Sequence, residues 1–259
     1  MVGATISGGI GSMTGMHGLI ADSLLSVRMV TASGQVVTAS ETENSDLFWG
    51  VRGAGANFGI ITSATYRLYD QTANGQGIMA TFVFPAAANR SVWELVRSYD
   101  DSLPRPLSVL PQMAYNRTSN ESFVVYAITY IGTLADAQPH IDKALALGPV
   151  SSTVIDDTVP VMNDALSGGA CTNGRHQRIH TIGLNRTDVD TFEDVFSEMD
   201  VFYKANPEYN GRVIFQRYSN EVALQKPVSA TSFPWRDIKT YLLVTQHSNF
   251  PFSAVHLAD

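Results

Sequence analysis

The stretch SGGIGSMTGMHGLIAD, residues 7–22, decides how the first part of the chain folds, and RGAGANFGIIT, residues 52–62, is its counterpart downstream. Both stretches are rich in glycine, and each leads into a β-like run. Glycine permits positive φ and lets the backbone approach a ligand closely, so such loops can turn backbone N–H groups towards an anion such as a pyrophosphate. The alternative is a pair of tight turns in a sheet domain, and the residues alone leave both interpretations open.

Two better-known nucleotide-binding loops are excluded. Residues 9–14 and 53–58 each match only the first half of G-x-G-x-x-G, and neither segment opens an amphipathic helix, so the Rossmann fingerprint fails on context. The chain contains no G-x-x-x-x-G-K-[ST] sequence, which excludes a P-loop. Any nucleotide must therefore be bound by another kind of loop.

The composition is that of a globular protein, and it argues against nucleic acid or an anionic membrane as a partner. The 259 residues are 44% apolar and 16% charged, with a net charge of −7, whereas both of those partners need basic patches. The single cysteine, Cys171, excludes an internal disulfide framework. No apolar run of about 18 residues is present to span a membrane. Localisation stays open: extracellular if a signal peptide lies upstream of Met1, otherwise cytoplasmic.

The hydrophobic pattern changes at residues 70–77, which are polar and without periodicity, so a boundary is expected there. Strands and a short helical turn capped by Asn44 or Ser45 are expected before the boundary. After it, strand and helix patterns alternate, which predicts an antiparallel sheet of about six or seven strands with helices on one face. The expected strands are 23–31, 35–39, 59–68, 77–84, 108–115, 123–130, 151–156, 179–184, 212–218 and 239–245.

Three amphipathic helices are expected in the second part of the chain. The first carries apolar residues at i, i+3, i+4 and i+7 starting from Val92. The second has Pro139 in its first turn, where a missing N–H costs little. The third starts at a capping box formed by Thr187 and Asp190. Residues 160–174 are predicted to form a loop.

The order and spacing of two long runs resemble the second half of the FAD-binding domain of the berberine-bridge-enzyme-like oxidoreductases, in the vanillyl-alcohol-oxidase superfamily. The runs are GGIGSMTGMHGLIADSLLSVRMVTASG and SETENSDLFWGVRGAGANFGIITSATYRL. Past residue 72 the resemblance is weaker, with a recognisable TSFPWRD at 231–237. The family is known for FAD held across two subdomains, often covalently, and for oxidising alcohols, sugars or alkaloid amines.

The resemblance implies an α+β fold built from two parts. Residues 1–72 would be the C-terminal part of a PCMH-type FAD-binding domain. Residues 73–247 would be a substrate-binding domain with an antiparallel β-sheet covered by helices, and residues 248–259 would be a tail.

The resemblance also implies which residues meet the cofactor. In the family, the GG-x-G turn meets the pyrophosphate, the G-L-x-x-D segment lies along the ribityl and ribose, and the backbone at the position of Gly59-Ile60 meets the adenine end. His17 stands where many relatives carry Tyr or His near the flavin, although a surface imidazole is an equal alternative. The implied cofactor-binding residues are Gly8, Gly9, Gly11, His17, Gly18, Ala21, Asp22, Gly55, Asn57, Gly59 and Ile60.

The catalytic candidates lie near the last strands, where relatives place an acid–base residue facing the flavin. Gln216 falls near the position where several relatives carry Glu, and an amide cannot take up a proton at neutral pH. Tyr218, Arg217 and Arg236 are then the alternatives. Strand residues that simply face solvent explain the same pattern equally well.

For the other reactive residues, the sequence context favours structural roles. His176 and His180 are four apart, but in a strand that spacing separates them by about 13 Å along one face, too far for one metal ion. Cys171 lies in no context typical of a nucleophile, so a buried small side chain is the simpler expectation.

The predicted function is an FAD-dependent oxidoreductase acting on a small organic molecule, such as a carbohydrate, an alcohol or a secondary metabolite, with O₂ as electron acceptor. The family's covalent His region would lie before Met1, so any FAD is expected to bind non-covalently and weakly. An incompletely covered flavin subdomain would expose apolar surface and favour self-association. The alternative is a non-redox protein, either a ligand-binding module or a cyclase-like enzyme, on the same scaffold.

Overall fold

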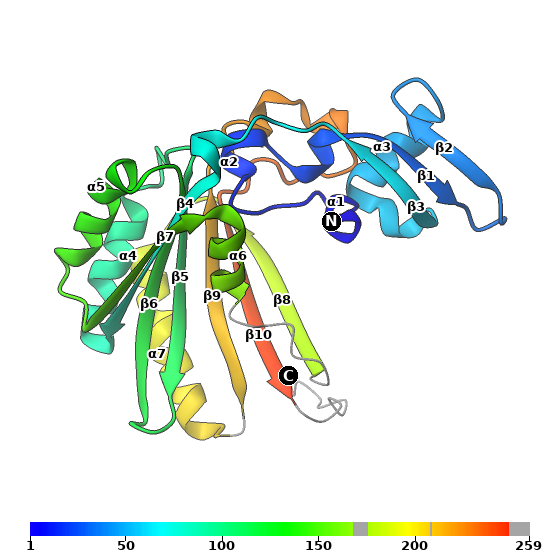
Figure 1. Cartoon of the computed structure of the whole chain (residues 1–259). Coiled ribbons are helices and arrows are strands. Elements are labelled where there is room, and N and C mark those ends of the chain that lie inside the picture. Colours follow the sequence, from blue (N-terminus) through cyan, green and yellow to red (C-terminus); the bar gives the residue numbers. More distant parts are fainter. Residues whose placement is uncertain (168–175, 208, 249–259) are drawn as a thin grey trace. The chain divides into compact units, whose positions relative to one another are not determined.

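The computed structural model describes residues 1–167, 176–207 and 209–248. The chain divides into two compact units (Figure 1). The first comprises Met1–Thr72, Pro104–Leu107 and Tyr218–Ile238, and the second comprises Ala73–Leu103, Ser108–Arg217 and Lys239–Asp259. The expected division assigned residues 218–238 to the second domain, whereas their contacts in the structure are with the first unit. Residue 171 and the tail from residue 249 lie outside the described residues.

The first unit is built on a small antiparallel sheet with strand order β2-β1-β3. Val27 pairs with Ala39 on one side and with Ala64 on the other, and β1 carries two register irregularities against β3. Its elements are α1 (Val2–Thr5), α2 (Thr14–His17), the 3-10 turn η1 (Ile20–Ser23), β1 (Leu24–Val30), β2 (Val36–Ser40), α3 (Ser45–Ala54), η2 (Gly55–Asn57), β3 (Ile60–Tyr66), η5 (Ala223–Gln225) and η6 (Val228–Ala230).

Helix α3 covers one face of this sheet. Phe48 and Val51 on the helix are fully buried against Val27 and Met29 of β1. Asn44 precedes the helix in the left-handed conformation, and its side chain donates to the Thr38 carbonyl rather than capping the first turn. The apolar cluster is small, so burial alone stabilises this unit only modestly.

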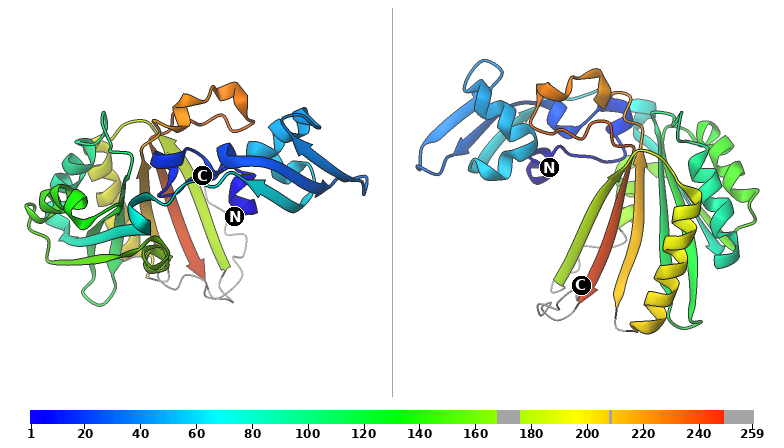
Figure 2. Two further views of the ribbon diagram at one scale, coloured as in Figure 1. Left: turned by 45° about the horizontal axis from the view of Figure 1, so that its top comes forward. Right: turned by 180° about the vertical axis from the view of Figure 1, so that it is seen from behind.

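The second unit contains a seven-stranded sheet with strand order β7-β4-β6-β5-β9-β10-β8 (Figures 1 and 2). The pairs β4–β6, β4–β7, β9–β10 and β8–β10 are antiparallel. Its elements are η3 (Thr72–Gly75), β4 (Gln76–Pro85), η4 (Ala86–Ala88), α4 (Asn89–Arg97), β5 (Leu107–Asn116), β6 (Glu121–Ile131), α5 (Leu134–Leu145), β7 (Ser151–Thr158), α6 (Val159–Ser167), β8 (His176–Leu184), α7 (Val189–Ala205), β9 (Asn210–Tyr218) and β10 (Thr240–Ser248). The expected α+β class is confirmed.

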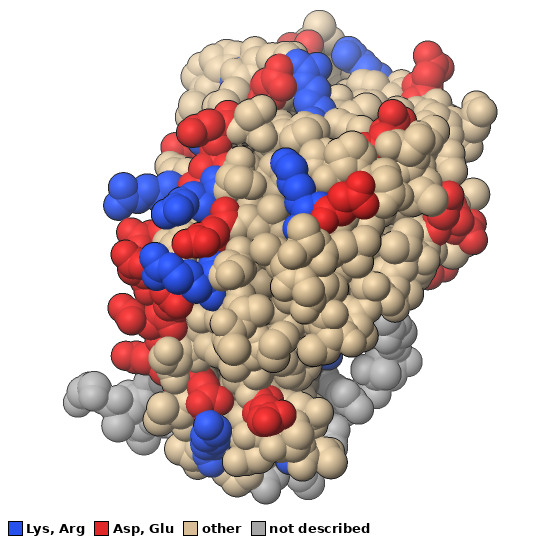
Figure 3. Space-filling model, turned by 90° about the vertical axis from the view of Figure 1, so that its left-hand side faces the viewer, with Lys and Arg blue, Asp and Glu red and all other residues tan. Residues whose placement is uncertain are grey.

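Helices α4, α5 and α7 cover one face of the large sheet. Trp93 of α4 and Phe192 of α7 both pack on Phe215 of β9, with ring centroids 4.8 and 4.9 Å from it. Between α4 and α7, Arg90 forms ion pairs with Asp190 and Glu193, on a surface where charges of both signs are interspersed (Figure 3). The helix-covered face is therefore the main apolar core of this unit.

Three sequence expectations in this unit were wrong. Residues 159–167 form α6 rather than a loop, and Met162 packs beside Gly77 on the sheet face opposite α5. Pro139 lies in the middle of α5 rather than in its first turn. The N-cap of α7 is Asp188, which accepts from the Thr191 N–H, whereas Thr187 donates its hydroxyl to Asp100.

Pro139 is tolerated because its surroundings face solvent. An internal proline removes the bond to the carbonyl four residues earlier, here that of Ala135. Both residues are exposed, so water can satisfy the freed carbonyl.

Candidate functional site

The glycine loop of residues 8–13 presents several backbone N–H groups that have no acceptor elsewhere in the described chain. The carbonyl oxygen of Gly8 accepts from the Ala21 N–H and that of Gly9 from the Ile20 N–H, each at 2.9 Å. A trans peptide unit is planar, with its C=O and N–H pointing in opposite directions. The N–H groups of Gly9 and Ile10 therefore point away from the turn that holds those carbonyls.

The next residues continue this arrangement. The Gly11 N–H donates to the Thr14 hydroxyl at 2.9 Å, and the Gly11 carbonyl accepts from the Thr14 N–H. The N–H groups of Ser12 and Met13, like those of Gly9 and Ile10, find no partner among the described residues. Neighbouring unpaired N–H groups form a concave site for an anion. Residues 8–13 thus fit a phosphate group.

Close packing explains most of the glycine content of these loops without any ligand. A Cβ on Gly8 would meet the Phe233 ring at 2.6 Å, one on Gly55 would meet Ile6 at 2.7 Å, and one on Gly59 would meet the Val30 carbonyl at 2.1 Å. Gly11 is different, because a Cβ there would meet nothing within 4 Å. Tight turns therefore account for most of these glycines. Close approach of a ligand remains the explanation for Gly11, which lies beside open space.

Asp22 and Arg236, both candidates from the sequence, form a buried ion pair with each other. The two terminal nitrogens of Arg236 each donate to one carboxylate oxygen of Asp22 at 2.9 Å. The side chains are 5% and 0% exposed. Asp22 also accepts from the Leu19 N–H. Arg236 is thus already engaged as a cation, which makes it a poor proton acceptor.

His17 lies beside a residue that the sequence did not single out. Its imidazole stacks on the Tyr69 ring with centroids 4.1 Å apart, and the Tyr69 hydroxyl accepts from Ser23 at 3.2 Å. Partial burial lowers the pKa of His17, so the ring is neutral at pH 7. A stacked aromatic pair cannot be recognised from residues 52 positions apart.

The second loop holds its shape through internal contacts. Asn57 donates from its side-chain amide to the Ala54 carbonyl at 3.0 Å. Ile60 begins β3 and is 73% exposed. Arg52 lies over the Phe48 ring at 4.2 Å, and burial lowers its pKa without removing its charge at pH 7. Of the two residues implied to meet the adenine end, Gly59 and Ile60, Ile60 is the more accessible.

The remaining catalytic candidates come from β9. Gln216 is half-buried and pairs with Tyr241 of β10. Its neighbour Phe215 faces α4 and α7, and successive strand residues alternate, so Gln216 faces away from those helices. Tyr218 is buried at the end of the strand and belongs to the first unit.

Arg217, the other alternative on β9, is a structural residue. It donates to Asp100 and Thr240 and to the Tyr99 carbonyl. His176 and His180 lie in β8 with exposed side chains. Within the described ranges, no group of three or more His, Cys, Asp or Glu side chains forms a metal site.

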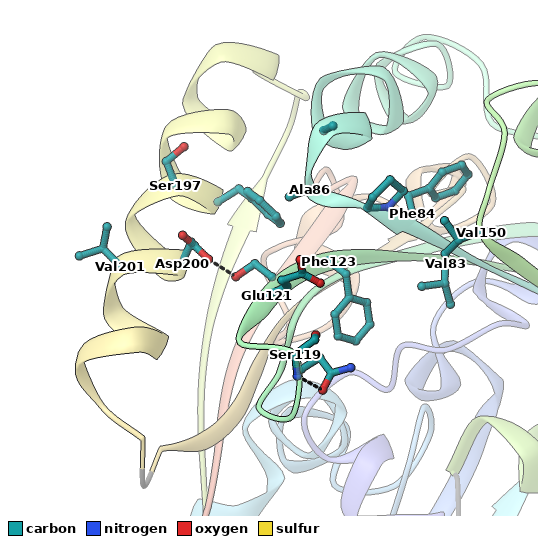
Figure 4. Close-up of a pocket in the computed structure, with 15 residues that line it drawn as sticks. Val83, Phe84, Ala86, Ser119, Glu121, Phe123, Val150, Ser197, Asp200 and Val201 are labelled. Carbon is teal, nitrogen blue, oxygen red and sulfur yellow. Dashed lines mark hydrogen bonds between the residues drawn. The ribbon is translucent and has the colours of Figure 1, made fainter.

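A hollow of about 780 Å³ lies in the second unit, and its lining residues include none of Gln216, Arg217, His176 and His180 (Figure 4). Phe84, Phe123 and Val150 form much of its apolar wall, with Glu121 and Asp200 beside them. Asp200 is bonded to Lys204 and to Ser122, and mainly the Lys204 bond lowers its pKa. Its carboxylate is therefore ionised and already paired.

Comparison with known proteins shows what this chain is similar to in sequence and in fold. No family model matches the chain. In sequence it is similar to the FAD-linked oxidoreductase azaL of Aspergillus niger, with 42% identity over 249 residues, covering 94% of this chain and 53% of that protein. In structure it is similar to Physcomitrella patens BBE-like 1, with a TM-score of 0.75 and 20% identity, covering 94% of this chain and 54% of the other.

A second solved structure, a glucooligosaccharide oxidase of Acremonium strictum described as revealing a novel flavinylation, has a TM-score of 0.77 at 17% identity, covering 100% of this chain and 56% of the other. The chain spans about half the length of the curated relatives it matches. The resemblance drawn from the sequence is confirmed: over the part that they share, the chain is homologous to the FAD-linked oxidoreductases and has the berberine-bridge-like fold. Among the described helices, none is both long and apolar enough to cross a membrane.

Proposed function

We propose that the chain is the flavin-nucleotide and substrate-binding portion of an FAD-dependent oxidase that acts on a small organic molecule. The observation that carries the proposal is the row of unpaired N–H groups in residues 8–13, together with 42% identity to an FAD-linked oxidoreductase. Phosphate oxygens are the strong acceptors that such a row can bind. When bound, FAD would supply the redox chemistry, the oxidation of a substrate C–H with O₂ as the final oxidant.

The chain's own residues bind and orient the groups around that reaction. The N–H groups of Gly9, Ile10, Ser12 and Met13 would hold the pyrophosphate, and the space beside Gly11 would let it approach. Backbone bonds of this kind contribute about 1 kcal/mol each. Because an amide takes up no proton at neutral pH, Gln216 would orient a substrate hydroxyl by hydrogen bonding rather than act as a base.

The substrate class that the comparison favours is a carbohydrate or another polyhydroxylated molecule, since one structural neighbour is a glucooligosaccharide oxidase. The face of the large sheet opposite α4 and α7 presents Gln216 and, in the same register, Tyr241. Amide and phenol groups are well suited to binding hydroxyl groups.

We further propose that the FAD is held without a covalent bond by the residues described here. A link to the flavin requires a histidine nitrogen or a thiolate. His17 is occupied in a stack with Tyr69, and none of the other candidate cofactor residues is a histidine or a cysteine.

A visible absorption spectrum of the purified protein after incubation with FAD and gel filtration tests the proposal. A flavin band that co-elutes with the protein is the expected result. After acid precipitation the colour should remain in the supernatant, and colour retained in the washed pellet would contradict the non-covalent mode. Absence of any flavin band would instead favour the non-redox alternative.

A further inference from the structure

We propose that the ion pair between Asp22 and Arg236 positions the phosphate-binding loop and so sets the affinity for FAD without touching the cofactor. This inference rests on the proposed function. Arg236 is a positioning residue in this account, neither a base nor a ligand. The evidence is a continuous series of contacts from the guanidinium group to the unpaired N–H groups.

The first link is the guanidinium itself. Arg236 makes four hydrogen bonds, two to Asp22, one to the Ala223 carbonyl at 3.2 Å and one to the Thr231 hydroxyl at 2.8 Å. Its Nε is buried and finds no partner within the described ranges of the chain. The bidentate geometry fixes both the distance and the orientation of the Asp22 carboxylate. Arg236 thereby joins residues 219–237 to the beginning of the chain.

The second link is the turn that carries Asp22. The Leu19 N–H donates to the carboxylate at 3.2 Å, which caps the turn η1 at the residue that precedes it. Within that turn, the N–H groups of Ile20 and Ala21 donate to the carbonyls of Gly9 and Gly8. The position of the carboxylate therefore determines where these two donors lie.

The third link is the peptide plane. Because the carbonyl of each glycine is bonded to the turn, the N–H of the following residue points the opposite way. Gly8 is also packed under Phe233, and a Cβ on Gly9 would meet Ile20 at 2.6 Å, so neither peptide can rotate freely. Loss of the ion pair would release the turn and with it the alignment of the two N–H groups.

The chain provides a matched control in its other buried ion pair. Arg217 donates to Asp100 at 2.9 Å, with side-chain exposures of 2% and 16%. Both residues lie in the second unit. The variants Asp22→Asn and Asp100→Asn each leave a buried arginine without its charge partner. They should cost similar stability, but only the first disturbs the glycine loop.

The test measures FAD binding by flavin fluorescence, at a temperature where circular dichroism shows both variants folded. Asp22→Asn is expected to raise the dissociation constant by about tenfold or more, the effect of weakening one or two phosphate hydrogen bonds. Asp100→Asn should change it by about twofold or less, because in the described part of the chain Asp100 shares no contact with the loop or with the ion pair. If both variants changed the dissociation constant equally, the ion pair would contribute only to the stability of the fold, and the proposal would be overturned.

Hydrogen exchange gives a second measurement that needs no flavin. Asp22→Asn should accelerate exchange of the Ile20 and Ala21 amides relative to wild type, and Asp100→Asn should not. Unchanged exchange at these amides in Asp22→Asn would overturn the proposal even if FAD binds. If wild-type protein binds no FAD, the proposed function fails, and exchange alone decides whether the ion pair aligns the loop. Arg236→Lys, which keeps the charge but not the bidentate geometry, replaces Asp22→Asn if that variant does not fold.

Discussion

The two units of the molecule are stabilised in different ways. In the second unit, large side chains such as Phe82, Trp93 and Phe215 are at most 1% exposed between the sheet and its helices. In the first unit the apolar clusters are small, and a buried arginine–aspartate pair joins segments that are 214 residues apart in sequence. The stability of the unit that carries the glycine loop 8–13 thus depends on polar contacts with specific geometry, whereas that of the second unit depends on burial of large apolar side chains.

The largest effect is expected from the core of the second unit. Phe215→Ala removes the ring on which both Trp93 and Phe192 pack, and should lower the free energy of unfolding by about 3–5 kcal/mol. Urea denaturation followed by far-UV circular dichroism measures the change. Val201→Ala, at a position 67% exposed on α7, is the control and should change stability little. An equal loss in both variants would contradict the packing described for Phe215.

Asp22→Asn is expected to cause a comparable loss of unfolding free energy, confined to the first unit. The substitution leaves the guanidinium of Arg236 buried without a counter-charge, which costs about 3 kcal/mol or more. Hydrogen exchange followed by mass spectrometry should show faster exchange in residues 8–30 and little change in β4 and β6. Equal acceleration of hydrogen exchange in both units would mean that the units unfold together, which would contradict their being stabilised separately.

A smaller effect, dependent on pH, is expected at Tyr99 in the second unit. Burial raises the pKa of its phenol to about 12, whereas the unfolded phenol ionises near 10. The stabilisation is therefore complete below pH 10 and is lost as pH rises towards 12, a change of about 3 kcal/mol or less in the free energy of unfolding. Tyr99→Phe should flatten the fall in unfolding free energy between pH 10 and 12. An unchanged slope in this variant would contradict the assignment to Tyr99.

The sequence predicted elements wherever one periodic pattern ran without interruption. Strands β4 and β6 and helix α7 lie where alternation or helical spacing placed them, because each buries one regular face. Helix α6 was missed because it is short and contains Pro160 near its start, and the packing of Met162 beside Gly77 is not visible in local sequence. Local pattern therefore predicts most elements but not those that form through tertiary contact.

In the candidate site, even more depends on tertiary contacts that local sequence does not reveal. The glycine loops could be recognised, since backbone conformation depends on residues close together in sequence. The pairing of Asp22 with Arg236 and the stacking of His17 on Tyr69 could not, because each brings distant residues together. Both residues of the pair were therefore assigned to the cofactor or to catalysis, and the structure gives each of them another partner.

The most direct test of the central claim compares two glycines that both lie beside open space. A Cβ at Gly11 or at Gly3 would meet nothing within 4 Å, so Gly11→Leu and Gly3→Leu should fold alike. Only the first places a side chain where the pyrophosphate is proposed to approach. Titration of FAD fluorescence should show binding to wild type and Gly3→Leu, and at least about tenfold weaker binding to Gly11→Leu, equivalent to about 1.4 kcal/mol. Equal affinity of the two variants would contradict binding of FAD by residues 8–13.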